Sequence, residues 1–177
     1  MALRRGVYIV PTNEWYIERT VWLIAGIALL ASTALALLVH PWFVLGVIAT
    51  GAFSITVALT GFCAVGSVLH RLGFESRLGE RGAARPAFYF MRTDSWYLER
   101  RIYAAVGVNI SVASLLSLVH SPWWLGFTAF VGGAMVWFSA TGFCIMANGL
   151  YWLGAEPRLA PLPTRKTTAA VDPRLPA

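Results

Sequence analysis

The chain has 177 residues, of which 58% are hydrophobic and 12% are charged, and its formal net charge is +6. A typical soluble domain carries about 25% charged residues, so this composition excludes an ordinary soluble domain and predicts an all-α membrane protein. The net positive charge does not indicate nucleic-acid binding. The basic residues flank apolar segments, where they fix orientation and contact anionic lipid, and we therefore expect no nucleic-acid partner.

The first half of the chain predicts two transmembrane helices. Residues 1–19 are polar and aromatic, and we expect an interfacial segment with a short helix capped by Asn13. Residues 21–39 form an uncharged run of 19 residues, about 28 Å of helix, which matches a hydrocarbon core of about 30 Å. Residues 43–69 predict a second helix of 27 residues that tilts or extends into the headgroups. Residues 20–70 are thus the predicted first transmembrane hairpin.

The second half repeats this plan. Residues 71–100 read as a cytoplasmic connection that contains a second interfacial helix, and residues 101–153 as a second transmembrane hairpin. Residues 154–177 form a Pro-rich cytoplasmic tail with too few apolar residues to fold alone. The predicted fold is four transmembrane helices in two parallel-repeat hairpins, with short interfacial helices before the first and third spans.

Residues 81 positions apart are identical at many places, which indicates a tandem duplication. The chain's two cysteines end the longest shared phrase, Thr60-Gly61-Phe62-Cys63 and Thr141-Gly142-Phe143-Cys144. The other matches include Trp15 with Trp96, Glu18 with Glu99, Arg19 with Arg100, Gly26 with Gly107, Gly51 with Gly132, and Pro41-Trp42 with Pro122-Trp123. Each repeat crosses the membrane twice, so the repeats are predicted to be parallel, related by an axis along the membrane normal.

The charges predict the orientation. All 14 Lys and Arg and all 8 Asp and Glu lie in residues 1–20, 70–101 or 154–177, and the turns at 40–42 and 120–123 carry none. Basic residues mark the cytoplasmic side of a membrane. We therefore expect a multi-pass protein of a bacterial-type inner (plasma) membrane with both termini in the cytoplasm.

The shared Thr-Gly-Phe-Cys phrase supplies the candidate site. Cys63 and Cys144 are either a sulfur-binding pair or small packing residues. As part of one apolar helix, each thiol would lie toward the negative end of the helix dipole, which disfavours the thiolate. The candidate substrate-binding residues are Cys63, Cys144, Thr60, Thr141, Gly61, Gly142 and Asn148.

The sequence predicts neither an enzyme nor a cofactor. No Asp, Glu, Lys or Arg falls inside a predicted span, and such intramembrane groups usually mark ion and proton paths. No acid–base pair and no set of metal ligands at metal spacing is recognisable, so no catalytic residue is assigned. His40 and His120, at the two turns, are either ligands of a metal or pigment or residues of the headgroup layer.

The order of these features resembles the YgaP-like inner-membrane domain, a family long classed as of unknown function. The shared features are Glu-Arg before a glycine-containing span, a Pro-Trp turn, and a second span that ends in Thr-Gly-Phe-Cys and closes on Leu-Gly. The resemblance covers about residues 12–79 and 93–159. Family members commonly have Pro after the cysteine, where this chain has Ala64 and Ile145.

The resemblance implies sulfur chemistry. The best-known family architecture joins one hairpin to a cytoplasmic rhodanese, a sulfur transferase, and its hairpins dimerise. This chain would replace the homodimer by an intramolecular pseudo-dimer and would need a separate sulfur-transfer protein.

Two functions are therefore open. The first is a small inner-membrane protein that handles or transports a sulfur species through the cysteine pair. The second is a non-catalytic accessory or structural subunit of a larger membrane complex. In both cases the predicted partners are the lipid bilayer and either other membrane subunits or the sulfur-transfer protein.

Overall fold

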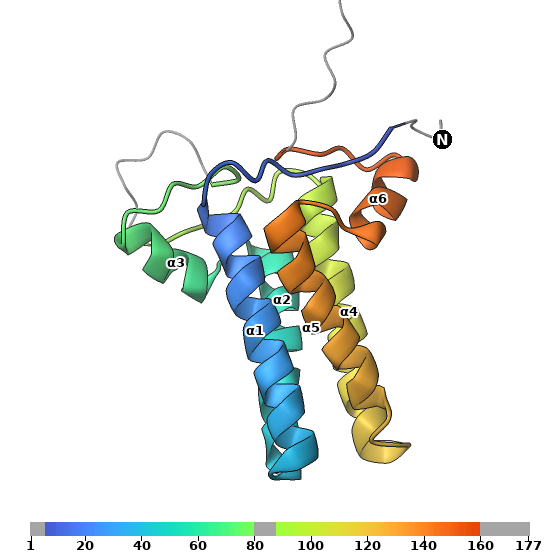
Figure 1. The fold of residues 1–177 in the computed structure, drawn as a ribbon. Coiled ribbons are helices and arrows are strands. Elements are labelled where there is room, and N and C mark those ends of the chain that lie inside the picture. The colour runs from blue at the N-terminus through green and yellow to red at the C-terminus, as the bar shows by residue number, and fades with distance from the viewer. Residues whose placement is uncertain (1–5, 80–87, 160–177) are drawn as a thin grey trace, which may run out of the picture.

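The computed structural model describes residues 6–79 and 88–159 (Figure 1). Its elements in chain order are α1 (Ile17–Leu38), the 3-10 turn η1 (Pro41–Phe43), α2 (Val44–Thr60), α3 (Ala64–Arg71), α4 (Leu98–Val119), α5 (Trp124–Thr141) and α6 (Ile145–Trp152). The fold class is confirmed, because the described part of the chain is helical and contains no β-strand beyond isolated bridges. Four helical segments, α1, η1 with α2, α4 and α5, are long and apolar enough to cross a membrane. The chain is a small integral membrane protein.

The second and fourth helices are shorter than predicted. α2 ends at Thr60 and α5 at Thr141, and the next glycine in each case adopts the left-handed conformation, with φ of 76° at Gly61 and 73° at Gly142. A left-handed residue ends an α-helix and turns the chain. The predicted single helix over residues 43–69 is therefore wrong, and so is its counterpart from Trp124 to Leu153. In each half a separate eight-residue helix, α3 or α6, follows the break.

The segments before α1 and α4 also differ from the prediction. The short interfacial helices expected there are absent from residues 6–16 and 88–97, which run extended. Ile9 forms an antiparallel bridge with Phe143, and Phe90 forms one with Phe62. Each extended segment thus pairs with the glycine connector of the other half, and α1 begins at Ile17 without a side-chain cap from Asn13.

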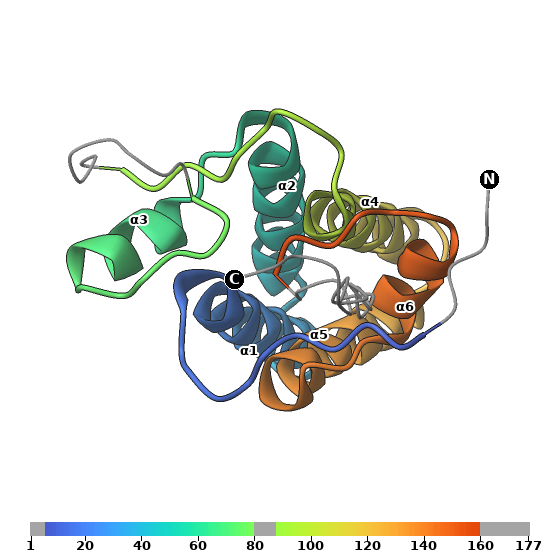
Figure 2. The ribbon, with the colours of Figure 1, turned by 90° about the horizontal axis from the view of Figure 1, so that it is seen from above.

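The transmembrane helices pack mainly between the two halves of the chain. α1 packs most extensively on α5 and α2 on α4, as Figure 2 shows from the end of the bundle. Glycines allow both close approaches. A Cβ added at Gly26 would lie 2.9 Å from the carbonyl oxygen of Gly132, and one at Gly107 would lie 2.9 Å from that of Gly51. Small residues are the usual means of close helix packing in membranes, where lipid competes for apolar contacts.

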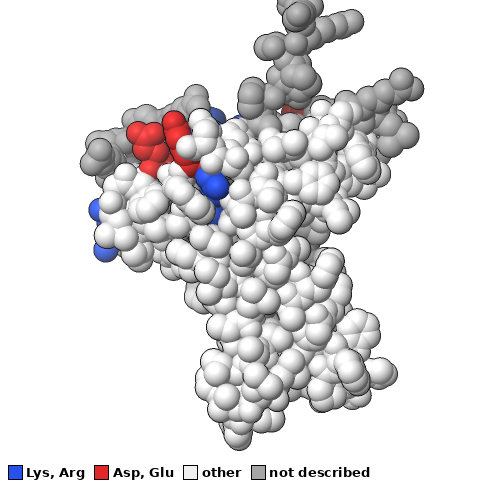
Figure 3. All heavy atoms as spheres, viewed as in Figure 1, with Lys and Arg blue, Asp and Glu red and all other residues white. Residues whose placement is uncertain are grey.

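Among the residues that the structure describes, charged side chains lie at one end of the bundle. The start of α1, the start of α4 and the helices α3 and α6 all lie at that end, and the lower part of the face in Figure 3 shows no charged side chain. Residues 154–159 run back over this end, and Ala155 and Leu159 are buried there. Residues 160–177 of the predicted Pro-rich tail lie outside the described residues.

Candidate functional site

The threonine of each Thr-Gly-Phe-Cys phrase closes the helix that precedes it. The Thr60 hydroxyl donates to the Thr56 carbonyl at 2.7 Å and accepts the Phe62 N–H at 3.1 Å. Thr141 makes the same pair of bonds, to the Trp137 carbonyl at 2.8 Å and from the Phe143 N–H at 3.2 Å. Both hydroxyls are therefore engaged in the helix break.

Backbone of the opposite half packs against each of the two glycines. The Met91 N–H donates to the Gly61 carbonyl at 2.8 Å, and the Val10 N–H donates to the Gly142 carbonyl at 3.0 Å. A Cβ at Gly61 would overlap the Met91 carbonyl oxygen, and one at Gly142 would overlap that of Val10. Glycine is required here both for its left-handed conformation and for this close approach.

The cysteines begin new helices, so their predicted place near the C-terminal end of a long helix is wrong. Cys63 is the N-cap of α3, and its Sγ accepts the Gly66 N–H at 3.2 Å. Its side chain is 5% exposed, and burial raises its pKa although the neighbouring amide hydrogen bonds lower it. Cys144 is the N-cap of α6 and is half-buried.

The structure does not bring the two thiols to a shared site. Both cysteines are free. α3 and α6, which they begin, lie on opposite sides of the bundle in Figure 2. Cys144 lines a cavity beside α4 and α5, whose lining does not include Cys63.

Asn148 belongs to the framework of the fold. Its Nδ2 donates to the carbonyls of Tyr8 at 3.0 Å and Cys144 at 2.9 Å, and its Oδ1 accepts the Tyr8 N–H at 2.7 Å. Ser67, its counterpart 81 residues earlier, accepts the Tyr89 N–H at 3.0 Å and donates to the Cys63 carbonyl at 2.8 Å. Both side chains thus fix the extended segment of the opposite half.

Two buried carboxylates hold the same end of the molecule, and the sequence did not indicate their role. Glu18 is 1% exposed and accepts from the Leu78 N–H at 2.7 Å and the Tyr89 hydroxyl at 2.9 Å. Further donors to Glu18 are the Ser76 hydroxyl at 3.0 Å and the Arg77 N–H at 3.1 Å. Buried charges are tolerated when their hydrogen-bonding capacity is satisfied.

Glu99 repeats this arrangement in the second half. It is fully buried and accepts from the Tyr8 hydroxyl at 2.8 Å, the Arg158 N–H at 3.0 Å and the Leu159 N–H at 2.8 Å. Each carboxylate is thus bonded by a tyrosine from the other half. The available signal was the identity of Tyr8 and Tyr89 at the repeat offset, which extends the repeat upstream of Trp15.

Burial and the neighbouring carboxylates give both tyrosines pKa values above the usual range. Desolvation is the largest cause at each, followed by the charge of Glu99 beside Tyr8 and of Glu18 beside Tyr89. Both phenols therefore remain neutral hydrogen-bond donors at physiological pH.

The arginine that follows each glutamate crosses to the end of a helix in the opposite half. Arg19 Nε donates to the Ser139 carbonyl at 2.7 Å, and Arg100 Nε donates to the Ala58 carbonyl at 2.7 Å. Such carbonyls near a helix C-terminus lack intrahelical donors or lie at the negative end of the dipole, which favours a cation. Each guanidinium also lies over a tryptophan ring, 4.0 Å from the centroid at Trp15 and 4.1 Å at Trp96.

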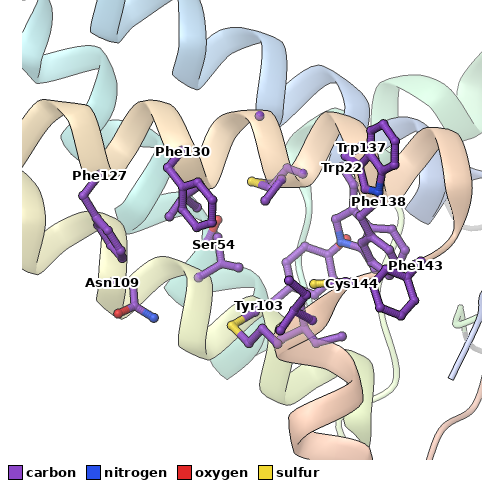
Figure 4. Close-up of a pocket in the computed structure, with 18 residues that line it drawn as sticks. Trp22, Ser54, Tyr103, Asn109, Phe127, Phe130, Trp137, Phe138, Phe143 and Cys144 are labelled. Carbon is purple, nitrogen blue, oxygen red and sulfur yellow. The ribbon is translucent and has the colours of Figure 1, made fainter. Parts of the chain in front are cut away.

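A cavity of about 620 Å³ lies between α4, α5 and α6. Figure 4 shows Asn109 and Phe127 at one end and Phe138, Phe143 and Cys144 at the other. Trp22 of α1 contributes to its inner wall.

The turn histidines are engaged locally. His40 Nδ1 accepts the Trp42 N–H at 3.2 Å, and His120 Nδ1 accepts the Trp124 Nε1–H at 3.2 Å. Among the residues that the structure describes, no group of three or more His, Cys, Asp or Glu could hold a metal ion.

Comparison with known proteins adds no family assignment. No family model matches the chain, and searches of curated proteins and of solved structures gave no match either.

Proposed function

We propose that the chain is a non-catalytic accessory subunit of a larger membrane protein complex. The observation that carries this proposal concerns the two Thr-Gly-Phe-Cys connectors, residues 60–63 between α2 and α3 and residues 141–144 between α5 and α6. Both are filled by other parts of the chain. At each connector the opposite half of the chain fills the space beside the glycine. The candidate polar groups Thr60, Thr141 and Asn148 all bond to the chain's own backbone. The chain's own backbone thus occupies the positions at which these groups would bind a substrate.

The charged residues at this end favour the same conclusion. Glu18, Glu99, Arg19 and Arg100 are all buried, and each bonds groups of the opposite half or of the returning chain. Chemistry on a substrate would require at least one such group to be available. A structural role in the membrane requires instead that these groups bond within the chain, as they do here.

Sulfur handling is the second candidate, and one observation favours it. Cys144 is half-buried and lines the cavity beside α5, so a small sulfur species that entered the cavity would meet its thiol. The resemblance to the YgaP-like domain supports the same function. In this version only Cys144 carries the activity, since Cys63 is buried and does not line the cavity.

For the membrane itself, we propose a bacterial-type inner membrane with both termini and the central connection, residues 71–100, on the cytoplasmic side. The support is that the charged side chains of the described residues lie at one end of the bundle, combined with the cytoplasmic preference of Lys and Arg.

The two candidates are separated by two measurements on the full chain. Native mass spectrometry after extraction in mild detergent is expected to show the chain with a second subunit in fixed stoichiometry, and a chain found only alone or with copies of itself contradicts the accessory role. Flux of thiosulfate and sulfane sulfur into vesicles is expected to be equal for the wild type and the Cys63→Ala/Cys144→Ala variant. Flux that is lost in the double variant but kept in the single variant Cys63→Ala, which retains Cys144, would establish sulfur handling instead.

A further inference from the structure

The helices α3 and α6 each leave one stripe of residues exposed or half-buried, and the two stripes occupy equivalent positions of the repeat. The α3 stripe consists of Ala64, Val65, Val68, Arg71 and the C-cap residue Leu72. The α6 stripe consists of Ile145, Met146, Gly149, Trp152 and the C-cap residue Leu153. Residues spaced by three or four lie on the same side of a helix, so each stripe is one face of its helix.

Both stripes are apolar, although they lie at the charged end of the bundle. Val68 and Leu72 are 58% and 71% exposed, and Ile145 and Leu153 are 78% and 57% exposed. Arg71 is the only charged residue of the two stripes. A helix face in contact with water is normally polar, so this composition indicates an apolar neighbour.

The opposite side of α3 is covered by the chain itself. The Tyr89 N–H donates to the Ser67 hydroxyl at 3.0 Å, and an added Cβ at Gly66 would lie 2.6 Å from the Tyr89 ring. Val68 follows Gly66 by two positions and therefore lies on the other side of the helix. In Figure 1, α3 lies beside the first turns of α1, and the chain that follows α3 runs above it, away from the membrane-spanning part. The stripe is thus left open on the side of α3 away from these contacts.

The α6 stripe is continuous with the surface of the bundle that faces the bilayer. Ile145 and Met146 of α6 line the same open cavity as Phe130 and Trp137 of α5. Phe130 and Trp137 belong to a membrane-spanning helix and are 67% and 62% exposed. Lipid that covers these two side chains therefore also reaches the beginning of α6.

The equivalent residues Arg71 and Trp152 suit the boundary between acyl chains and headgroups. The Arg71 guanidinium lies over the exposed ring of Phe88, 5.3 Å from its centroid. The Trp152 Nε1–H donates to the Gly6 carbonyl at 2.8 Å. Both residue types combine an apolar body with a polar group and are common at the membrane interface.

We propose that α3 and α6 lie in the membrane interface at the charged end of the bundle, where their stripes contact the acyl chains of the phospholipids of that leaflet. Arg71 and Trp152 then lie at the level of the headgroups. The interfacial helices of this protein thus follow the second and fourth spans, whereas the sequence predicted them before the first and third. The proposal does not depend on the accessory role, because it concerns lipid and not a protein partner.

Spin labels on single cysteines test the proposal in the full chain. The background is Cys63→Ser/Cys144→Ser, because serine is also an N-cap residue and can accept the amide hydrogen bond that Cys63 accepts. Labels are attached after Val68→Cys in α3 or Leu153→Cys at the end of α6, and the purified protein is placed in vesicles of phosphatidylethanolamine and phosphatidylglycerol. Collision rates with oxygen, which concentrates among acyl chains, and with a water-soluble nickel chelate then give the depth. We expect both labels about 5–10 Å into the headgroup and acyl boundary, as for other interfacial helices.

Two further labelled positions are the controls. Glu75→Cys is exposed on the chain that follows α3, and Phe53→Cys replaces a side chain that is 60% exposed on the membrane-spanning helix α2. The nickel collision rate at positions 68 and 153 should be several-fold lower than at Glu75→Cys, and the oxygen rate should approach that at Phe53→Cys. Nickel rates as high as at Glu75→Cys would place the stripes in water, and low rates with both reagents would mean that protein covers them. Either result would overturn the proposal.

Discussion

At the scale of single residues, the polar groups of this membrane protein act mainly on its own backbone. Glu18 and Glu99 each accept hydrogen bonds from consecutive backbone N–H groups of the chain that returns after α3 or α6. This arrangement explains how a carboxylate can be buried at the start of a membrane-spanning helix. The ionised acceptor is stabilised by several donors, and the first turn of the helix favours negative charge.

Removing one carboxylate charge should destabilise the whole bundle. In Glu99→Gln the side chain keeps its size, but its amide nitrogen cannot accept the Arg158 N–H that Oε2 accepts at 3.1 Å. The negative charge that strengthens the remaining hydrogen bonds is also lost. We expect a loss of about 2–3 kcal/mol in the free energy of unfolding, as for hydrogen bonds to charged groups. Thermal or denaturant unfolding in detergent measures it.

Glu14→Gln is the matched control. Glu14 pairs with Arg77 at 3.0 Å, but its side chain is 67% exposed, and exposed pairs contribute about 0–1 kcal/mol. A Glu99→Gln protein as stable as Glu14→Gln would show that the buried carboxylate is not needed in its charged form.

The two thiols should differ in reactivity. Cys63 is buried, accepts an amide hydrogen bond and has a pKa raised by burial, whereas Cys144 is half-buried at the wall of the cavity. Because thiol reagents require both access and thiolate, a membrane-permeant maleimide should modify Cys144 several-fold faster than Cys63. The single-cysteine variants Cys63→Ala and Cys144→Ala, followed by mass spectrometry, give the two rates. Equal rates would mean that Cys63 is accessible in the membrane.

At the scale of elements, the apolar runs predicted four membrane-spanning helices, and the structure confirms them. The ends of α2 and α5 were mispredicted, because hydropathy continues unchanged through Gly61 and Gly142 into α3 and α6. A glycine within an apolar run does not by itself show that its φ is positive. The decisive contact comes from residues that are distant in sequence, Met91 and Val10, whose backbone lies beside these glycines. The pairing of Tyr8 with Glu99 was missed for the same reason, since it joins residues 91 positions apart.

A side chain at either connector glycine should disrupt the break between helices. Gly61→Ala places a Cβ in the left-handed conformation, which costs roughly 1–2 kcal/mol, and adds an overlap with the Met91 carbonyl. We expect a total loss well above that range, measured as a fall in unfolding free energy.

Gly73→Ala separates the two causes. Gly73 has φ of 92° and open space around an added Cβ, so its substitution carries only the conformational cost. If Gly61→Ala is no more destabilising than Gly73→Ala, the close approach of the Met91 segment contributes nothing to stability.

At the scale of the whole molecule, the two halves are held together by reciprocal contacts. The segment before α1 pairs with the connector of the second half, and the segment before α4 pairs with that of the first. The arginines Arg19 and Arg100 cross in the same way, and the bundle packs α1 on α5 and α2 on α4. The buried charged groups of each half take hydrogen-bond partners from the other half, so both halves should fold and unfold as one unit.

The tyrosine–carboxylate hydrogen bonds between the halves predict a loss of stability at alkaline pH. Tyr8 and Tyr89 have pKa values raised by burial and by the carboxylates that they bond. The contribution of each is fully present below the unfolded value of about 10. Above it the unfolded chain releases protons that the folded chain retains, so stability falls as pH rises. Thermal unfolding between pH 8 and 11 should show a decline that begins near pH 10.

The double variant Tyr8→Phe/Tyr89→Phe identifies the groups responsible. It should be less stable at pH 8, because Glu18 and Glu99 each lose a donor, and its decline above pH 10 should be shallower than that of the wild type. Some slope should remain, since burial also raises the pKa of Cys63, Tyr16 and Tyr97, which the variant keeps. An unchanged slope would show that Tyr8 and Tyr89 do not cause the alkaline sensitivity. Because Tyr8 and Tyr89 each join opposite halves, a single transition that shifts as a whole, without a second one, would also show that the two halves unfold together.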